Sequence, residues 1–319
     1  MKKTFLITTA LLAFFCISCE DELLDPNITV NQPTNSNGNG NGNGNGNGNG
    51  NGNGNGNGNT TALSTYTLDT TTNVPIFGEI IVNSDFIINN DIVISANVET
   101  TVSGFTDSAV STLTRDSNGR IIQSEAMNGG NVTNRTTVTY TGDNITQIAF
   151  EDLGDPTENY TYTFAYSGNT VTRTNAAANE SAVFTFDANS RLISMESFAG
   201  TTSTQLEVLT YANDNCVSSI ITGDANLSNT FVHDSFTNPL KPVFNDQILL
   251  AIFDNDNDDE LGTYLATFFS TNNWIRIEST DGTIDLNPMY STNNDIISRN
   301  GVIDLGDGVL ITQSETFQY

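Results

Sequence analysis

The stretch "YTYTFAY", from Tyr160 to Tyr166, decides the fold. Its aromatic residues occupy every second position, so Tyr162 and Phe164 share one face with the two end tyrosines, while threonine and alanine take the other face. A period of two is typical of a β-strand that buries one side. We therefore expect a strand whose aromatic row lies in the core. The alternative is a row that stacks on sugars.

Related segments recur on both sides of this strand. "LTRDSNGRI" (Leu113 to Ile121) and "FTFDANSRL" (Phe184 to Leu192) match at Thr, Asp, Asn and Arg. Each reads as a strand, a tight polar turn and a returning strand. A regular period of such units predicts hairpins that pack against their neighbours. Shorter-turned versions are "VTYTGDNI" (Val138 to Ile145), "FAYSGNTV" (Phe164 to Val171) and "LTYANDNC" (Leu209 to Cys216).

Short apolar runs separated by polar turn residues continue in both directions along the chain. "FSTNNWI" (Phe269 to Ile275) and "YSTNNDI" (Tyr290 to Ile296) are weaker echoes of the unit. "PIFGEIIVNSDFIINNDIVIS" (Pro75 to Ser95) predicts three β-rich runs broken at "NSD" and "NND". Only "DQILLAIF" (Asp246 to Phe253) is equally compatible with a helix or a strand.

These patterns predict an all-β domain over residues 61–319, with the clearest repeats in 113–223 and weaker ones in 267–319. We expect mainly antiparallel, repeated β-hairpins that form an extended or open barrel-like sheet. Roughly 260 residues are enough for one large domain, or two modest ones, with a real core.

Residues 1–18 predict an export signal. Lys2 and Lys3 precede the apolar run "FLITTALLAFFCI", which is too short to span a membrane, and Ser18 is the small residue before the expected cleavage. The following run "CISCEDE" resembles a bacterial lipoprotein signal, which implies lipidation of Cys19. Its acidic residues resemble the surface-export signal of Bacteroidota lipoproteins. The resemblance implies a chain anchored to the outer membrane by lipid and facing the cell exterior. An ordinary secretory signal is the alternative.

Residues 19–60 predict a lipidated flexible linker, which includes eleven Asn-Gly pairs from Asn37 to Gly58. Glycine loses much conformational freedom on ordering, and this segment has almost nothing apolar to offset that entropy. A disordered Gly-rich tether of about 40 residues has an r.m.s. end-to-end distance of roughly 35 Å and a taut limit of about 140 Å. That reach is enough to lift a domain away from a membrane surface.

The charge of the chain restricts its partners. The formal net charge is −27, and removal of Lys2 and Lys3 with the signal gives −27 − 2 = −29. Nucleic acid is therefore not expected as a partner, because phosphate binding depends on Lys and Arg. If Cys19 is lipidated, Cys216 has no cysteine partner, so the fold is expected to stand without a disulfide.

The "DSNGRI" and "DANSRL" turns, with their aromatic-x-aromatic strands, resemble YD repeats of the RHS type. The segment "HDSFTNPLKPVF" (His233 to Phe244), followed by the "STNN" echoes, is similar to uncharacterised Bacteroidota surface lipoproteins that carry such repeats. This resemblance covers about residues 105–319. Arg115 replaces the expected aromatic residue, and the units are too few to imply a toxin shell. The resemblance supplies architecture and location, but no catalytic residues.

One acidic cluster, "FDNDNDDELGTY", is a candidate metal site. Asp254, Asp256 and Asp258 alternate, so a loop could direct three carboxylates at one Ca²⁺ ion. The helical calcium-loop motif fails, because Asp259 stands where that motif has glycine. Ca²⁺ is thus the one candidate cofactor, and a solvated acidic loop is the alternative.

No catalytic constellation can be assembled from the sequence, so we expect no enzyme. The single histidine, His233, lies beside Asp234 and Ser235, but consecutive strand residues point to opposite faces. Trp274 is expected in the core or at its rim, with sugar stacking as the alternative. The leading hypothesis is a non-catalytic surface module that binds a glycan, a protein or another envelope component through residues that the sequence does not identify. The alternatives are a structural envelope spacer and a carboxylate-dependent hydrolase.

Overall fold

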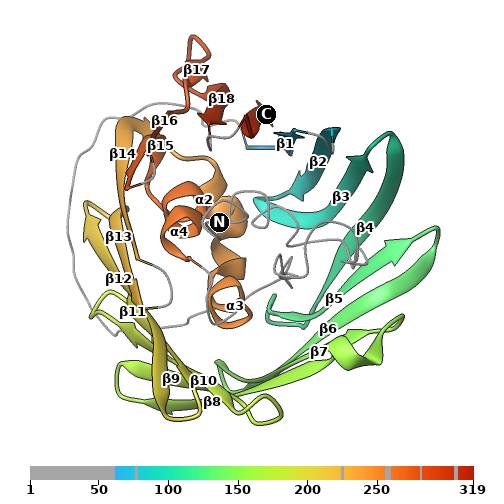
Figure 1. Cartoon of the computed structure of the whole chain (residues 1–319), viewed down its shortest axis with the longest axis vertical. Coiled ribbons are helices and arrows are strands. Elements are labelled where there is room, and N and C mark those ends of the chain that lie inside the picture. The colour runs from blue at the N-terminus through green and yellow to red at the C-terminus, as the bar shows by residue number, and fades with distance from the viewer. Residues whose placement is uncertain (1–61, 76–77, 224–225, 256–259, 281, 305–307) are drawn as a thin grey trace.

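The computed structural model describes residues 62–75, 78–223, 226–255, 260–280, 282–304 and 308–319. They form one antiparallel sheet of 19 strands, not closed into a barrel, that curves around a group of short helices (Figure 1). The predicted all-β, antiparallel hairpin fold is confirmed. The predicted signal and linker lie outside the described residues.

The strands follow one another around the sheet in chain order. They are β1 (Thr65–Val74), β2 (Gly78–Asn89), β3 (Ile92–Val102), β4 (Phe105–Arg115), β5 (Ile121–Asn128), β6 (Asn131–Thr141), β7 (Asn144–Asp152), β8 (Tyr160–Ser167), β9 (Thr170–Asn175), β10 (Glu180–Phe186), β11 (Leu192–Ala199), β12 (Thr202–Ala212), β13 (Asn215–Gly223), β14 (Leu227–Thr237), β15 (Asn272–Ser279), β16 (Gly282–Asp285), β17 (Met289–Tyr290), β18 (Ile296–Asp304) and β19 (Leu310–Gln318). The helices are η2 (Pro156–Glu158), α2 (Leu240–Phe244), η3 (Asn245–Gln247), α3 (Ile248–Phe253) and α4 (Gly262–Phe268).

The last strand returns to the first, so β19 pairs with β1 as well as with β18. Among the described residues, the ladder is interrupted between β16 and β18. There the Asn300 N–H donates to the Leu286 carbonyl at 2.9 Å. Gly301 allows this close approach, because an added Cβ would lie 2.9 Å from the Leu286 side chain.

A shared turn explains the sequence repeat. The Asp116 carboxylate accepts hydrogen bonds from the N–H groups of Asn118 and Arg120, at 2.8 and 3.0 Å, and pairs with the Arg120 guanidinium at 2.6 Å. The same guanidinium lies over the Tyr140 ring of the next hairpin, 4.5 Å from its centroid. The aspartate therefore closes the turn while the arginine binds the neighbouring hairpin. The equivalent residues are Asp187, Asn189, Arg191 and Tyr211.

The echo "YSTNNDI" forms a third turn of this type with serine in place of aspartate. Ser291 Oγ accepts from the N–H groups of Asn293 and Asp295, at 3.1 and 3.2 Å. The Tyr319 hydroxyl donates to the Ile296 carbonyl at 3.0 Å, as Tyr140 does to Ile121 in the first turn. This echo is therefore a true repeat of the hairpin.

Two predictions about individual segments were wrong. "FSTNNWI" is no hairpin unit, because Phe269 caps the end of α4 and β15 begins at Asn272. "NSD" does not break a strand, since residues 83–85 continue β2 and Ser84 points inward between Val82 and Phe86. Because Val82, Ser84 and Phe86 all point inward, the alternation of buried and outward residues continues through this segment. The packing of these inward side chains outweighs the preference of Asn and Asp for turns.

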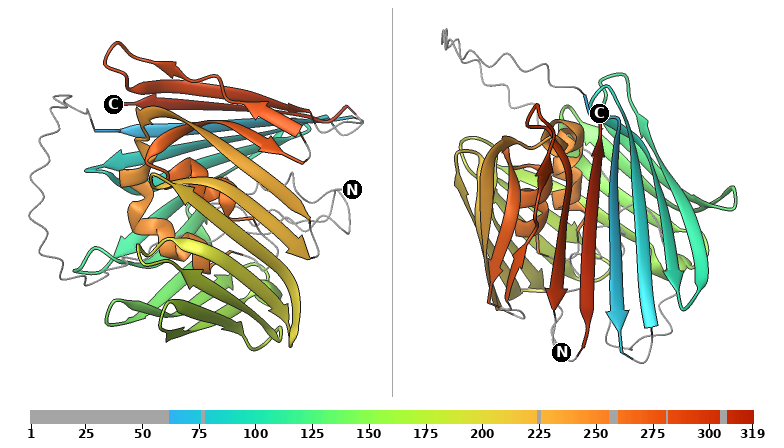
Figure 2. Two further views of the ribbon diagram at one scale, coloured as in Figure 1. Left: turned by 90° about the vertical axis from the view of Figure 1, so that its left-hand side faces the viewer. Right: turned by 90° about the horizontal axis from the view of Figure 1, so that it is seen from above.

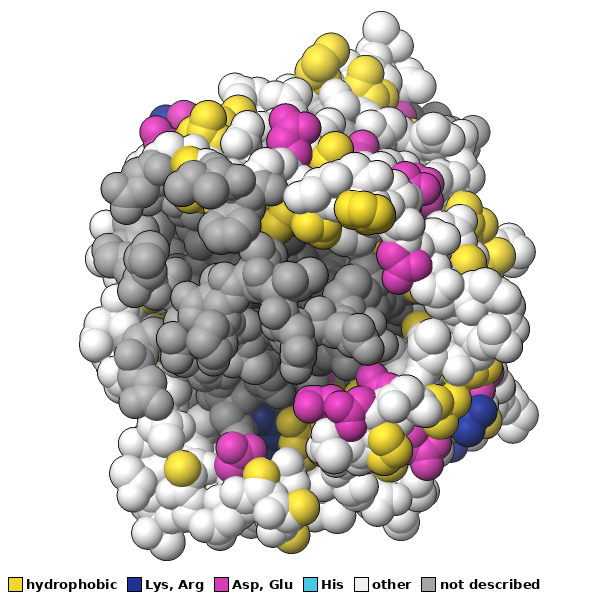
Figure 3. All heavy atoms as spheres, turned by 45° about the vertical axis from the view of Figure 1, so that its right-hand side comes forward, with side chains coloured by type: hydrophobic (Ala, Val, Ile, Leu, Met, Phe, Trp, Pro, Cys, Tyr) yellow, Lys and Arg dark blue, Asp and Glu magenta, His cyan; other side chains and the backbone are white. Residues whose placement is uncertain are grey.

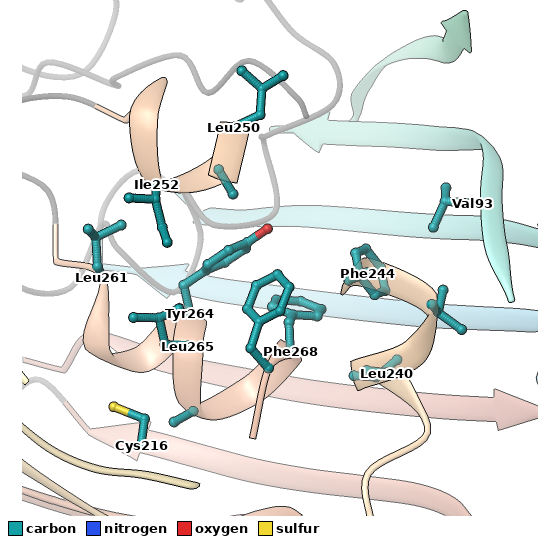
Figure 4. Packing of buried hydrophobic residues seen from close by; sticks show 14 of the residues in the cluster. Val93, Cys216, Leu240, Phe244, Leu250, Ile252, Leu261, Tyr264, Leu265 and Phe268 are labelled. Carbon is teal, nitrogen blue, oxygen red and sulfur yellow. The ribbon is translucent and has the colours of Figure 1, made fainter. Parts of the chain in front are cut away.

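The helical segment between β14 and β15 fills the space inside the curved sheet. Within this segment "DQILLAIF" is largely helical. The segment also contains α2 and α4, which the sequence did not predict. Figure 4 shows Phe244 and Phe268 packed together, with ring centroids 4.7 Å apart. These helices have only five to seven residues, and α4 buries all of its side chains, so they show no clear amphipathic period.

The aromatic row of β8 lies in the core only at its middle, since Tyr160 is half-buried and Tyr166 is 38% exposed. Tyr162 and Phe164 are buried, and the Phe164 ring lies 5.0 Å from that of Phe253 in α3. Trp274 is also buried, and Cys216 is a buried free thiol. No helix in the described part of the chain is long and apolar enough to cross a membrane.

The two ends of the sheet differ. β1 begins beside the end of β19, where the Ser64 N–H donates to the Gln318 carbonyl at 2.7 Å, and Figure 2 shows these strands side by side. We call this end the terminal edge; the three Asp- or Ser-closed turns lie on it. We call the opposite end the far edge. It carries the turns at residues 103–104, 129–130, 153–159 and 200–201.

Candidate functional site

The predicted calcium ligands fall partly within the described structure. Asp254 follows α3, is buried, and accepts a hydrogen bond from the Tyr160 hydroxyl at 3.1 Å. Asp256, Asp258 and the predicted lipidation residue Cys19 lie outside the described residues. Within the described ranges, no three His, Cys, Asp or Glu side chains are grouped so that they could hold a metal ion. The Ca²⁺ site therefore stays a prediction.

His233, Asp234 and Ser235 do not form a catalytic triad. The Asp234 carboxylate accepts hydrogen bonds from the Phe236 N–H and the Tyr290 hydroxyl. Burial lowers the pKa of His233, which lies opposite Trp274 in the β14–β15 ladder. These partners hold the aspartate at the end of β14, away from the role of orienting a catalytic base.

Glu207 and Glu260 form a buried pair of glutamates that the sequence did not predict. Glu207 points inward from β12 and accepts hydrogen bonds from Ser219 at 2.6 Å and from the N–H groups of Leu261 and Gly262 at 2.8 Å. Those N–H groups belong to the start of α4, where backbone donors have no partner within the helix. Glu207 thus fastens the interior helix to the wall of the sheet.

Glu260 lies beside this contact, in buried surroundings that favour its protonated form. Its carboxyl group accepts hydrogen bonds from Asn229 and, at 3.1 Å, from Thr263. Burial, followed by the charge of Glu207, raises the pKa of Glu260 to about 8. Burial also raises the pKa of Glu207, against the opposing effect of its three hydrogen-bond donors.

The pair resembles the two carboxyl groups of a glycosidase only in composition. Both side chains are buried, and they accept hydrogen bonds from the protein's own backbone and side chains. Glycoside hydrolysis needs two carboxyl groups that flank an accessible bond and a water molecule. We therefore interpret Glu207 and Glu260 as structural. A sequence signal existed in the repeat unit "LTYANDNC", because a period of two places Glu207 on the same inward face as Leu209 and Tyr211.

We expect Glu260→Gln to reduce the loss of stability at alkaline pH. The folded pKa of about 8 lies above the ordinary 4.5, so the folded state binds the proton more tightly. The contribution of Glu260 to stability is therefore fully present below pH 4.5 and is lost as the pH rises through 8. At about 1.4 kcal/mol per pKa unit, the shift is worth on the order of 3–5 kcal/mol. Urea unfolding of wild type and variant between pH 5 and pH 9 measures the difference.

Glu99→Gln is the matched control, because Glu99 is exposed on the outer face of β3. We expect this variant to keep the wild-type pH dependence. A Glu260→Gln protein whose stability falls as steeply as wild type would show that Glu260 does not hold the proton.

Every Lys and Arg side chain in the described structure has a hydrogen-bond or ion-pair partner. Eight Lys and Arg residues follow the predicted signal. Arg173 donates to the carbonyls of Phe253 and Asn255, and Lys241 donates to Thr271. In the described structure, no cation is left without a partner, and acidic side chains spread over the face shown in Figure 3. The other six, which pair with carboxylates, are Arg115, Arg120, Arg135, Arg191, Arg276 and Arg299.

At the far edge, two rows of side chains cross the inward face of six paired strands: β18, β19, β1, β2, β3 and β4. We call these two rows the mouth. The outermost row is mostly apolar, and it ends at Phe105, which is 83% exposed. Its members are Ile303, Ile311, Thr72, Ile80, Val102 and Phe105. The second row is mostly polar: Gly301, Gln313, Thr70, Val82, Thr100 and Asp107. Ile303, Ile311, Val82, Thr70 and Gln313 are buried, so the accessible part of these rows is the outer end formed by Val102, Phe105 and Asp107.

Comparison with known proteins gives structural likeness only. No family model and no curated protein matches the chain. A porin-like protein from Bacteroides uniformis is similar at 11% identity, over 80% of this chain and 96% of that one, with a TM-score of 0.45. Another, from Bacteroides vulgatus, shares 11% identity over 81% and 98%, with a TM-score of 0.20. The Photorhabdus luminescens Tc holotoxin pore shares 12% over 75% of this chain and 14% of that one, with a TM-score of 0.27. Function has to be argued from this chain's own residues.

Proposed function

We propose that the chain is a cell-surface lipoprotein whose β domain is a non-catalytic binding module for a glycan, a protein or another envelope component. Lipidated Cys19 anchors it to the outer membrane, and residues 19–60 form the tether. One observation carries the proposal. The chain enters and leaves the sheet at the terminal edge, whereas the mouth, with its exposed Phe105, lies at the far edge.

This arrangement favours recognition over the other two hypotheses. A structural spacer gains nothing from an aromatic side chain that is 83% exposed at its tip, whereas a binding surface does. A carboxylate-dependent hydrolase would need an accessible pair of acids, and the buried glutamate pair is committed to holding α4. The paired state of the cations disfavours nucleic acid as a partner.

The test is a screen of the full chain against an array of glycans and envelope polymers, with and without Ca²⁺, in which released products are monitored. We expect saturable binding without products. Products would replace the proposal with a hydrolase. If the chain binds no member of the array and no component of envelope extracts, the proposal of a binding module is replaced by that of a structural spacer.

We expect Cys19→Ala to release the protein from membranes. Without the thiol no lipid can be attached, and anchoring by acyl chains accounts for all of the membrane affinity in this proposal. The measurement is the share of the protein in the membrane pellet after washing with high salt. Cys216→Ala is the control, since that thiol is buried in the sheet. Tight membrane association of the Cys19→Ala chain would contradict the lipid anchor.

A further inference from the structure

We propose that the outer end of the mouth, formed by Val102, Phe105 and Asp107, binds an arginine side chain of a basic partner protein. This inference rests on the proposed function and assigns it a class of partner and the residues that recognise it. All three side chains are accessible to solvent at the tip of the β3–β4 hairpin.

A tight turn holds the Phe105 ring in solvent. Ser103 and Gly104, with φ of 52° and 82°, form the two-residue connection between β3 and β4. Positive φ at both central positions matches the twist of the flanking strands, and Val102 and Phe105 pair directly across the hairpin. Phe105 is 83% exposed and Val102 is 38% exposed. The two side chains therefore offer an apolar contact that a partner can reach.

A fixed carboxylate lies beside this ring. Asp107 is exposed and, two positions along β4, points to the same face as Phe105, about 7 Å away along the strand. Its Oδ1 accepts hydrogen bonds from the Ser108 N–H at 2.9 Å and from Asn128 at 2.7 Å. Within the described ranges, no Lys or Arg side chain forms an ion pair with it. The carboxylate is therefore oriented, and its negative charge has no counter-ion there.

The terminal edge of the same sheet shows which group fits between a carboxylate and an aromatic ring. The Arg120 guanidinium pairs with Asp116 at 2.6 Å and lies 4.5 Å from the centroid of the Tyr140 ring. The second long turn repeats this arrangement. A guanidinium can stack on a ring and bind a carboxylate with its planar fork at the same time. Phe105 and Asp107 present the ring and the carboxylate without the arginine.

The missing arginine has to come from another protein. Six of the seven arginines in the sequence pair with carboxylates, and Arg173 donates to backbone carbonyls. A second copy of this chain therefore has no free arginine to offer. The formal net charge of −27 attracts basic proteins and repels acidic ones.

The shape of the outer end also favours a protein side chain over a sugar. Small ligands are usually bound in concave sites, where several polar groups surround them. A hairpin tip with one ring and one carboxylate suits a single long side chain. Val102 would contact the apolar stem of that arginine, while Phe105 and Asp107 bind its guanidinium.

The experiment titrates the full chain with the peptide Gly-Arg-Gly-Arg-Gly-Arg-Gly by isothermal calorimetry. The reference peptide carries citrulline, which is neutral and nearly the same shape, in place of each arginine. The variants are Phe105→Ala and Asp107→Asn. The matched controls are Val302→Ala, 59% exposed on the outer face of β18, and Glu79→Gln, which removes the same charge from the outer face of β2.

We expect the arginine peptide to bind and the citrulline peptide to bind at least about tenfold more weakly. Phe105→Ala and Asp107→Asn should each weaken binding of the arginine peptide about threefold or more, whereas each control should change it less than about 1.5-fold. Neither variant should lower the melting temperature. Phe105 is exposed, and the asparagine keeps an oxygen that accepts from Ser108 and Asn128.

Three results would overturn this inference. Equal affinity for the two peptides would show that the guanidinium is not recognised. Equal weakening by Glu79→Gln and Asp107→Asn would show that the peptide follows net charge alone. No binding of the arginine peptide, with a glycan bound at Phe105 instead, would assign the outer end to a sugar. Each of these results leaves the proposed binding function in place, because only failure against both the array and the envelope extracts removes it.

Discussion

Replacing Arg299 by Met is expected to lower the free energy of unfolding by on the order of 3–5 kcal/mol. Arg299 and Glu315 are both 0% exposed and form two hydrogen bonds of 2.7 Å. The Tyr66 hydroxyl donates to the same carboxylate at 2.7 Å. Removal of the guanidinium leaves a buried carboxylate without its counter-ion, and the desolvation cost of that charge is then uncompensated. Urea unfolding of the full chain measures the loss.

The position of the pair explains why the sheet depends on it. Arg299 lies in β18 and also donates to the Trp274 carbonyl in β15, at 3.2 Å. It therefore connects the strands on the two sides of the interrupted ladder between β16 and β18. The exposed pair of Arg276 and Asp285 provides the control, because Arg276→Met should cost less than about 1 kcal/mol. Equal losses for both variants would contradict this account of the sheet.

Gly262→Ala is expected to destabilise the protein by on the order of 2–4 kcal/mol. A Cβ at Gly262 would lie 2.3 Å from Ser219 Cβ and 3.2 Å from Glu207 Oε1. The start of α4 must then move away from the sheet, which breaks the hydrogen bonds that Glu207 accepts from Leu261 and Gly262. Thermal unfolding, read by near-ultraviolet circular dichroism, reports the loss because the interior aromatics surround α4.

Gly154→Ala is the matched control for this effect. Gly154 is exposed in the β7–β8 connection, and its nearest neighbour to an added Cβ is a side-chain oxygen of Asp152 at 3.3 Å. That substitution should change stability by less than about 1 kcal/mol. If Gly262→Ala proves equally mild, the interior helix is not held by close packing against β13.

The features that the sequence predicts correctly are local ones. The alternation in "YTYTFAY" and the repeated Asp and Arg of the two longer turns each depend on residues within one hairpin. Their physical causes, side-chain period and turn closure, are already expressed over fewer than ten residues. The hairpin architecture could therefore be predicted before any contact was known.

The interior and the mouth could not be predicted, because they depend on residues far apart in the chain. Glu207 meets Gly262 across 55 positions, and no short window contains both. The rows of the mouth exist only because β19 pairs with β1 in a particular register. α4 is buried on all sides, so its sequence does not show the alternation of apolar and polar residues every 3.6 positions that marks a surface helix.

The central claim is that the mouth binds its ligand without turnover, and methyl NMR of the full chain tests it most directly. The tightest ligand from the array is titrated into protein labelled at isoleucine and valine methyl groups. We predict shifts at Ile80, Val102, Ile303 and Ile311, with no new product signals and no shifts at Val208 and Ile220 on the outer face. Shifts confined to Val208 and Ile220, or the appearance of product signals, would contradict the account.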